Sequence, residues 1–170
     1  MEAAQKFLDY SCAKLNQYCD RIGVCLEQLS EEDIWIRGTD HENAIGNLIL
    51  HLSGNLHQWI GFGVAGKPDV RMRDQEFEAR DGAGAAELKA RLDAAVRETI
   101  EIVSSLSASQ FNGTVRVQGY EVSVLEAVYH VVEHFSYHTG QIIFATKMLN
   151  GQDLGFYAHL NQAEHSEQAP

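Results

Sequence analysis

Apolar residues near the start of the chain recur in alternating steps of four and three. The residues that follow this rule are Leu8, Cys12, Leu15, Cys19, Ile22, Leu26 and Leu29. This spacing places them on one stripe of an α-helix over about six turns, and such a stripe is typical of a helix buried against other helices. It predicts a helix over residues 2–29 that forms part of a bundle.

Three later segments show the same helical periodicity and predict helices over residues 42–61, 85–106 and 124–149. The last one opens on Ser123 and Glu126, the spacing of a capping box. A chain of 170 residues suits a single domain. The sequence therefore predicts an all-α, four-helix bundle domain over residues 1–170.

The connections between the helices predict how they are arranged. Residues 62–84 show no periodicity, and a loop of this length can carry the chain back along the bundle. The second and third helices would then be parallel, which gives an up-down-down-up topology. Residues 114–122 alternate around Gln118-Gly119, so we expect a small β-hairpin before the last helix.

Charge and cysteine content narrow the functional classes. Thirteen Lys and Arg against 24 Asp and Glu give a net charge of −11, which disfavours nucleic-acid and membrane partners. Cys12, Cys19 and Cys25 match no Cys-x-x-Cys pattern, and we interpret them as small core residues. The first residues do not resemble a signal peptide, so we expect a cytoplasmic protein.

His130, His134 and His138 stand four residues apart in the last predicted helix. This spacing stacks them on one helix face, where neighbouring members of the row can bind one metal ion. His130 and His138 are separated by about 12 Å along the axis, too far to share an ion from this helix. The pair is therefore either His130/His134 or His134/His138.

A further ligand can come from His51, which lies near the buried edge of the second predicted helix. Metal sites in bundles are built from side chains on facing helices. For the remaining histidines we expect structural or solvent-exposed positions, without a role in metal binding. These are His41, His57, His159 and His165.

The segment from His130 to Ile142 (HVVEHFSYHTGQI) and the segment Asn47–Leu52 (NLILHL) resemble the motifs of the DinB/YfiT-like metalloenzymes. The resemblance covers nearly the whole chain and implies an up-down-down-up bundle. It implies a divalent metal ion held by His51, His134 and His138, with His130 close to the site but outside the ligand set. Thr139 occupies a position where the family often carries an arginine.

The resemblance also implies a function, because the family includes enzymes that use low-molecular-weight thiols. The leading hypothesis is a metal-dependent thiol S-transferase acting on a small molecule. Three neutral imidazoles suit zinc or nickel, and also iron or manganese. The alternatives are a metal-dependent hydrolase and a non-catalytic metal-binding stress-response protein. The family also leads us to expect a homodimer.

Other residues near these motifs receive structural interpretations. Glu133 points about 100° away from the neighbouring ligand and is a weak candidate for a general base. Arg71 and Arg73 could hold the carboxylate of a thiol cofactor, although local ion pairs are expected for them. We interpret the aromatic residues Trp59, Phe135 and Tyr137 as core or interface residues, and the sequence identifies no catalytic residue.

Overall fold

The computed structural model describes residues 2–161, and the four predicted long helices all form. Their observed bounds lie close to the predicted ones, except in the second helix. Its α-helical part begins later, at Ile45, and ends earlier, at Leu56, where a π-helical segment continues it. The long helices are α1 (Glu2–Glu27), α2 (Ile45–Leu56), α4 (Ala85–Ser104) and α6 (Val124–Asn150). The shorter elements are η1 (Asp33–Trp35), α3 (Arg73–Glu78), α5 (Ala108–Phe111), β1 (Thr114–Val117), β2 (Tyr120–Ser123) and η3 (Ala158–Asn161).

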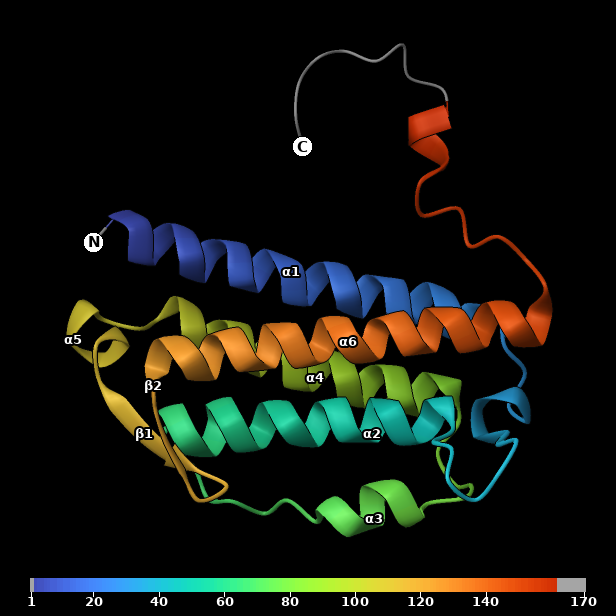
Figure 1. The fold of residues 1–170 in the computed structure, drawn as a ribbon, viewed down its shortest axis with the longest axis horizontal. Helices are drawn as coiled ribbons and strands as arrows, with labels where there is room; N and C mark the ends of the chain where they lie inside the picture. The colour runs from blue at the N-terminus through green and yellow to red at the C-terminus, as the bar shows by residue number, and fades with distance from the viewer. Residues whose placement is uncertain (1, 162–170) are drawn as a thin grey trace.

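The long helices form an up-down-down-up bundle, as the sequence predicts (Figure 1). Helices α1 and α6 run in one direction, and α2 and α4 run in the other. Both α1 and α2 pack against α4 and α6, so α1 and α2 lie on opposite corners of the bundle. This arrangement brings the middle of α2 beside the middle of α6.

The core consists of the predicted apolar stripes. Leu15 and Ile22 of α1, Ile49 of α2, Leu92 of α4 and Phe135 of α6 are all fully buried. Burying one such side chain contributes about 1.5–3 kcal/mol, so the bundle has a large apolar core.

The long connection after α2 is more structured than predicted. Helix α2 continues as a π-helical segment, η2 (His57–Val64), and the helix α3 forms within the expected loop. Figure 1 shows this connection running back beside α2 to the start of α4. The interpretation of residues 62–84 as a crossover is confirmed, but its description as a structureless loop is wrong for residues 62–64 and 73–78.

The entry into α6 is built as its sequence predicts. Strands β1 and β2 form an antiparallel hairpin, and the turn residues Gln118 and Gly119 have φ angles of 53° and 81°. Such left-handed pairs are typical of two-residue hairpin turns. The hydroxyl of Ser123 accepts a hydrogen bond from the Glu126 backbone N–H, which completes the cap of α6.

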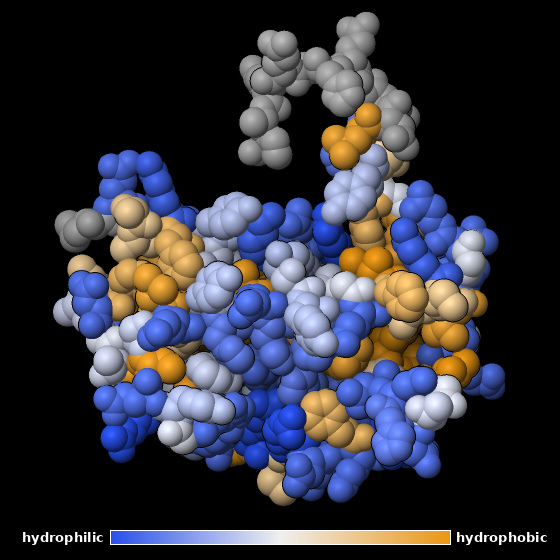
Figure 2. All heavy atoms as spheres, viewed as in Figure 1, coloured by the Kyte–Doolittle hydropathy of each residue, from blue (hydrophilic) through white to orange (hydrophobic). Residues whose placement is uncertain are grey.

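The outer surface over α6 is hydrophilic across its middle, and apolar residues gather toward its ends (Figure 2). The exposed apolar side chains near the end of α6 include Phe144, Met148 and Leu149. Within residues 2–161, none of the helices combines the length and apolar character that crossing a membrane requires.

Candidate metal centre

His51, His134 and His138 form one cluster, which we call the histidine trio. The Nε2 atom of His51 on α2 lies 3.0 Å from Nε2 of His134 on α6. The Nε2 atom of His138, one turn further along α6, lies 3.2 Å from the same atom of His134. One nitrogen from each of the three rings falls within 4.8 Å of the others. The three nitrogens therefore converge on a single point between α2 and α6.

This geometry suits one divalent ion. Zinc is held by histidine nitrogens at about 2.0–2.1 Å, and tetrahedral angles then place two ligand nitrogens ~3.4 Å apart. The observed separations of 3.0 and 3.2 Å need only small ring movements to reach that value. Three neutral imidazoles leave the +2 charge uncompensated and leave a coordination position open for water or a small molecule.

Burial keeps the imidazoles of α6 in the neutral form that binds metal. Burial, together with the neighbouring His138 and His51, lowers the pKa of His134 to about 3. Burial also lowers the pKa of His138, against an opposing hydrogen bond with Gln141. Near neutral pH, metal binding at these two nitrogens therefore requires no loss of a proton from them.

His130 lies outside the trio. Its half-buried ring packs against Trp59 at a centroid distance of 3.8 Å, and its centroid is 5.5 Å from that of His134. Of the two pairs that the sequence left open, the structure joins His134 and His138 to His51. His130 instead forms part of the wall beside them.

Glu76 and Arg71 contact His51 of the trio from the crossover connection, and this contact is not predicted by the sequence. The carboxylate of Glu76 lies 3.0 Å from Nδ1 of His51. Arg71 donates two hydrogen bonds of 2.8 Å to the same carboxylate. The expected local ion pair of Arg71 is confirmed, but the pair is buried against a metal-ligand candidate. No spacing rule indicates such a contact, because it depends on where α3 packs.

Arg73 lies on the same side of the site. Its guanidinium group stacks over the ring of Phe77 at 4.9 Å, and the Phe77 ring lies 4.7 Å from that of His51. Arg73 has no ion pair with any of residues 2–161. The ring of Phe77 therefore lies between the positive charge of Arg73 and His51.

The other histidines lie away from the trio, as predicted. His57 forms an ion pair with Glu98 of α4. His41 and His159 are exposed, and His165 lies outside the described residues. Glu133 is exposed and forms no hydrogen bond or ion pair with the trio, which agrees with its interpretation as a weak candidate for a general base.

The aromatic predictions have mixed outcomes. Phe135 is a fully buried core residue, and Trp59 is buried beside His130. Tyr137 is 64% exposed and lies edge-on to His138 at a centroid distance of 5.0 Å, so a core position for it is wrong.

The cysteines are buried and free, as predicted. Burial raises the pKa of the Cys19 thiol to about 12, and its hydrogen bond to the carboxylate of Asp93 acts in the same direction. Burial also raises the pKa values of Cys12 and Cys25. None of these thiols is therefore suited to act as a nucleophile near neutral pH.

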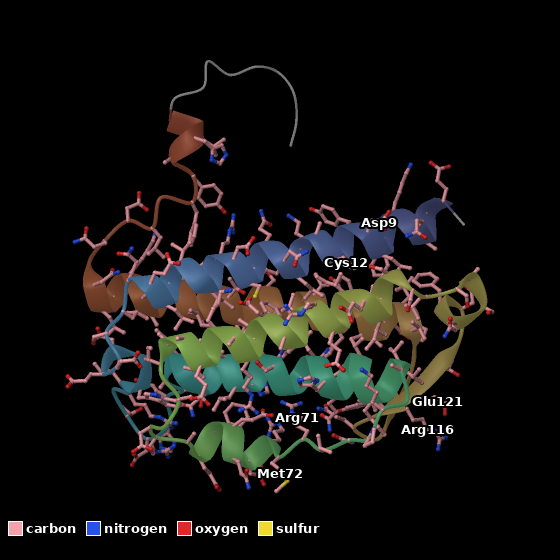
Figure 3. The ribbon with its side chains drawn as sticks, turned by 180° about the vertical axis from the view of Figure 1, so that it is seen from behind. Asp9, Cys12, Arg71, Met72, Arg116 and Glu121 are labelled. Atoms are coloured by element: carbon pink, nitrogen blue, oxygen red, sulfur yellow. The ribbon has the colours of Figure 1, made fainter. Side chains whose placement is uncertain are left out.

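A cavity of about 570 Å³ lies on the other side of the Arg71–Glu76 pair. Its wall is formed by residues of α2, η2, the connection around Val70, α3 and α4, and the trio does not line it. In the view from behind, Arg71 lies between α2 and the connection that carries α3, whereas Met72 points away from the bundle (Figure 3).

Comparison with known proteins agrees with this architecture. The sequence matches the family described as "Protein of unknown function (DUF1572)" over residues 2–159. A search of curated proteins finds no match.

Two solved structures are similar in fold. A conserved protein from Enterococcus faecalis has a TM-score of 0.73 and 14% identity, and the match covers 85% of this chain and 97% of that one. A DinB-like protein from Bacillus subtilis, YjoA, has a TM-score of 0.66 and 14% identity, with 87% and 96% covered. The fold is therefore that of DinB-like proteins.

Proposed function

We propose that this chain, which belongs to the DUF1572 family and has a DinB-like fold, is a divalent-metal protein. Its proposed activity is the transfer of a low-molecular-weight thiol to a small electrophile. The observation that carries the proposal is the convergence of the Nε2 atoms of His51, His134 and His138. The uncompensated charge of a bound ion stabilises the deprotonated form of a thiol or of water.

The residues present fit such an ion. Each member of the trio offers an Nε2 atom toward the common point, and the Nδ1 atoms of His51 and His138 contact side-chain oxygens of Glu76 and Gln141. Hydrogen bonds of this kind orient metal-binding histidines and select the nitrogen that faces the ion.

The nucleophile must come from outside the chain, because all three cysteines are buried and protonated near neutral pH. In the reaction, the thiol loses its proton to solvent and its sulfur forms a bond to the electrophilic carbon. The leaving group departs with the bonding electron pair. The charge of Arg73 beside Phe77 supports a thiol or electrophile that carries a carboxylate.

The hydrolase alternative has less support, since it needs a carboxylate that activates water. Of the acidic side chains within residues 2–161, Glu76 contacts the trio, but it does so at Nδ1 of His51, away from the converging nitrogens. The carboxylate is also held by Arg71. We therefore favour thiol transfer over hydrolysis.

Cobalt-substituted protein tests this proposal against both alternatives. Bacillithiol, mycothiol, glutathione and coenzyme A would each be added in turn, and binding of one of them should produce a strong thiolate-to-cobalt absorption band. That thiol should then react faster with an electrophile in the presence of the protein, and His138→Ala should abolish the acceleration. Esterase or amidase turnover without any thiol band would favour the hydrolase, and no signal in either assay would favour the non-catalytic alternative.

The native metal and the assembly are parts of the same proposal. Three imidazoles accept zinc, nickel, iron or manganese, and the order of affinities does not identify the native ion. The expected homodimer is tested by sedimentation, where a single monomeric species would contradict it.

A further inference from the structure

The Nδ1 atom of His51 has two close neighbours that require opposite protonation states of this nitrogen. Oε2 of Glu76 lies 3.0 Å away and can only accept a hydrogen bond. Nη2 of Arg71 also lies 3.0 Å away and can only donate. If Glu76 is the partner, Nδ1 carries the proton and Nε2 presents its lone pair to His134. If Arg71 is the partner, Nε2 carries the proton and cannot bind a metal ion.

The carboxylate of Glu76 decides between these two states because it engages Arg71 as well. Nε and Nη2 of Arg71 donate to its two oxygens, which is a bidentate ion pair. The side chains of Arg71 and Glu76 are only 2% and 9% exposed, so the pair is not screened by water. The ion pair uses the Nε hydrogen and one of the two Nη2 hydrogens of Arg71, so the second Nη2 hydrogen competes with Glu76 for Nδ1 of His51. The charged carboxylate is the stronger partner, because hydrogen bonds to ionised acceptors are about twice as strong as neutral ones and metal-binding histidines commonly donate to a carboxylate.

A glycine on α2 provides the space for this ion pair. A Cβ atom at Gly54 would lie 2.0 Å from Oε1 of Glu76 and 2.9 Å from Nε of Arg71. Any larger residue at position 54 would therefore push the carboxylate away from its position beside His51.

The backbone of α3 is fixed independently of the carboxylate. The side-chain amide of Asn47 donates to the carbonyl oxygens of Glu76 and Ala79. Arg37 donates to the carbonyls of Phe77 and Ala79. Because these contacts do not involve the Glu76 side chain, α3 should stay against α2 when that side chain is changed.

We propose that Glu76 is a positioning residue that holds His51 in the Nδ1-protonated tautomer, with Nε2 free for the ion, by accepting a hydrogen bond from Nδ1 in competition with the donor Arg71. The inference rests on the proposed metal site. It makes the crossover connection, through the contact of Glu76 with His51, a determinant of metal affinity.

Metal-free protein provides the first test, because it does not depend on metal binding. Correlation of the ring protons and nitrogens of His51 by ¹⁵N NMR distinguishes the two tautomers. Wild-type protein should show the Nδ1-protonated form, and Glu76→Ala should shift His51 toward the Nε2-protonated form. A wild-type His51 that is protonated at Nε2 would overturn the proposal.

Metal affinity provides the second test. Glu76→Ala should weaken zinc binding by about 10–100-fold in a chelator competition, the usual effect of losing such a partner. It should also change the visible spectrum of the cobalt form. Glu76→Gln, whose amide oxygen still accepts from Nδ1, should lose less, and Glu78→Gln on the exposed side of α3 is the matched control. Unchanged zinc affinity and an unchanged cobalt spectrum in Glu76→Ala would contradict the proposal.

Two further variants separate positioning from a loss of stability. Replacing Arg71 by methionine in the Glu76→Ala background should restore part of the affinity, because it removes the competing donor and its charge. Gly54→Ala should weaken zinc binding without removing any polar group, whereas Gly61→Ala, whose Cβ meets no atom within 4 Å, should not. If Glu76→Ala does not fold, Glu76→Gln and Gly54→Ala carry the same test.

The outcomes also separate this inference from the proposed function. A wild-type protein that binds no divalent ion would contradict the metal site, while the tautomer of His51 in metal-free protein would still support or overturn the role of Glu76. No loss of affinity in both Gly54→Ala and Glu76→Ala would overturn that role even if the wild type binds zinc tightly.

Discussion

Nε2 of His51 lies 3.0 Å from Nε2 of His134, although the two histidines are separated by 83 residues in the chain. The up-down-down-up topology creates this contact, because it places α2 beside α6 with His51 level with the second histidine of the row. Local sequence placed each histidine on a helix face, and only the packing of the helices brought the two faces together.

We expect the bundle to fold without metal. Its core consists of apolar residues such as Leu15, Ile49 and Phe135, which do not depend on the trio. Chelation should lower the melting temperature, because an ion that binds only the folded state stabilises it. The far-ultraviolet circular dichroism signal of the helices should persist at 25 °C. Loss of most of that signal after chelation would indicate a structural ion instead.

Phe135→Ala should destabilise the protein by about 3–5 kcal/mol, because it leaves a cavity beside the buried face of α6. Phe144→Ala is the matched control on the same helix. Phe144 is exposed, and its loss should change the free energy of unfolding by no more than about 0.5 kcal/mol. Urea denaturation of the metal-free variants measures both effects, and equal destabilisation by the two substitutions would contradict the assignment of α6's buried face.

Native protein should resist thiol alkylation at pH 7.5. Burial raises the pKa values of Cys12, Cys19 and Cys25, so little of the reactive thiolate is present. Mass spectrometry after treatment with iodoacetamide should show no adduct on the folded protein and three adducts in urea. Rapid labelling of the folded protein would mean that the chain can supply its own nucleophile.

Asp93 should contribute stability that depends on pH. Burial raises the pKa of its carboxyl, but hydrogen bonds from Lys89 and Cys19 outweigh this effect and hold the pKa below its usual range. The contribution is therefore present above the unfolded-state pKa of about 3.9 and is lost as the pH falls through the lower folded-state value.

The midpoints of urea unfolding, measured at several pH values, test this pH dependence of the stability. Because the side chain is 41% exposed, Asp93→Asn should cost no more than about 1 kcal/mol at pH 6. The difference in free energy of unfolding between the wild type and the variant should shrink as the pH falls from the unfolded-state pKa through the lower folded-state pKa of Asp93, because the carboxyl then becomes protonated in both states. A difference that stays constant between pH 6 and pH 3 would show that the charge of Asp93 does not stabilise the fold.

The sequence predicted the parts of this protein that local patterns encode. The stripe from Leu8 to Leu26 and the Ser123–Glu126 cap each depend on residues within one helix, and both form as expected. The histidine row was visible for the same reason. The spacing could not decide between His130 and His138, because the choice depends on which of them faces His51 on another helix.

The parts that the sequence did not predict arise from contacts between distant segments. Helix α3 has six residues and no apolar periodicity, and its backbone is held by Asn47 and Arg37. The contact of Glu76 with His51 follows from that packing, and so does the space beside Gly54. A run of charged residues gives no indication of which carboxylate will be buried.

The claim at the centre of this account is that His51, His134 and His138 hold one divalent ion, and His134 is the member that both neighbours approach. Elemental analysis of purified wild type, His134→Ala and His130→Ala, each loaded with zinc and dialysed, tests it most directly. We expect close to one ion per chain in the wild type and in His130→Ala, whose ring packs against Trp59, and none in His134→Ala. Full zinc occupancy in His134→Ala would contradict the account.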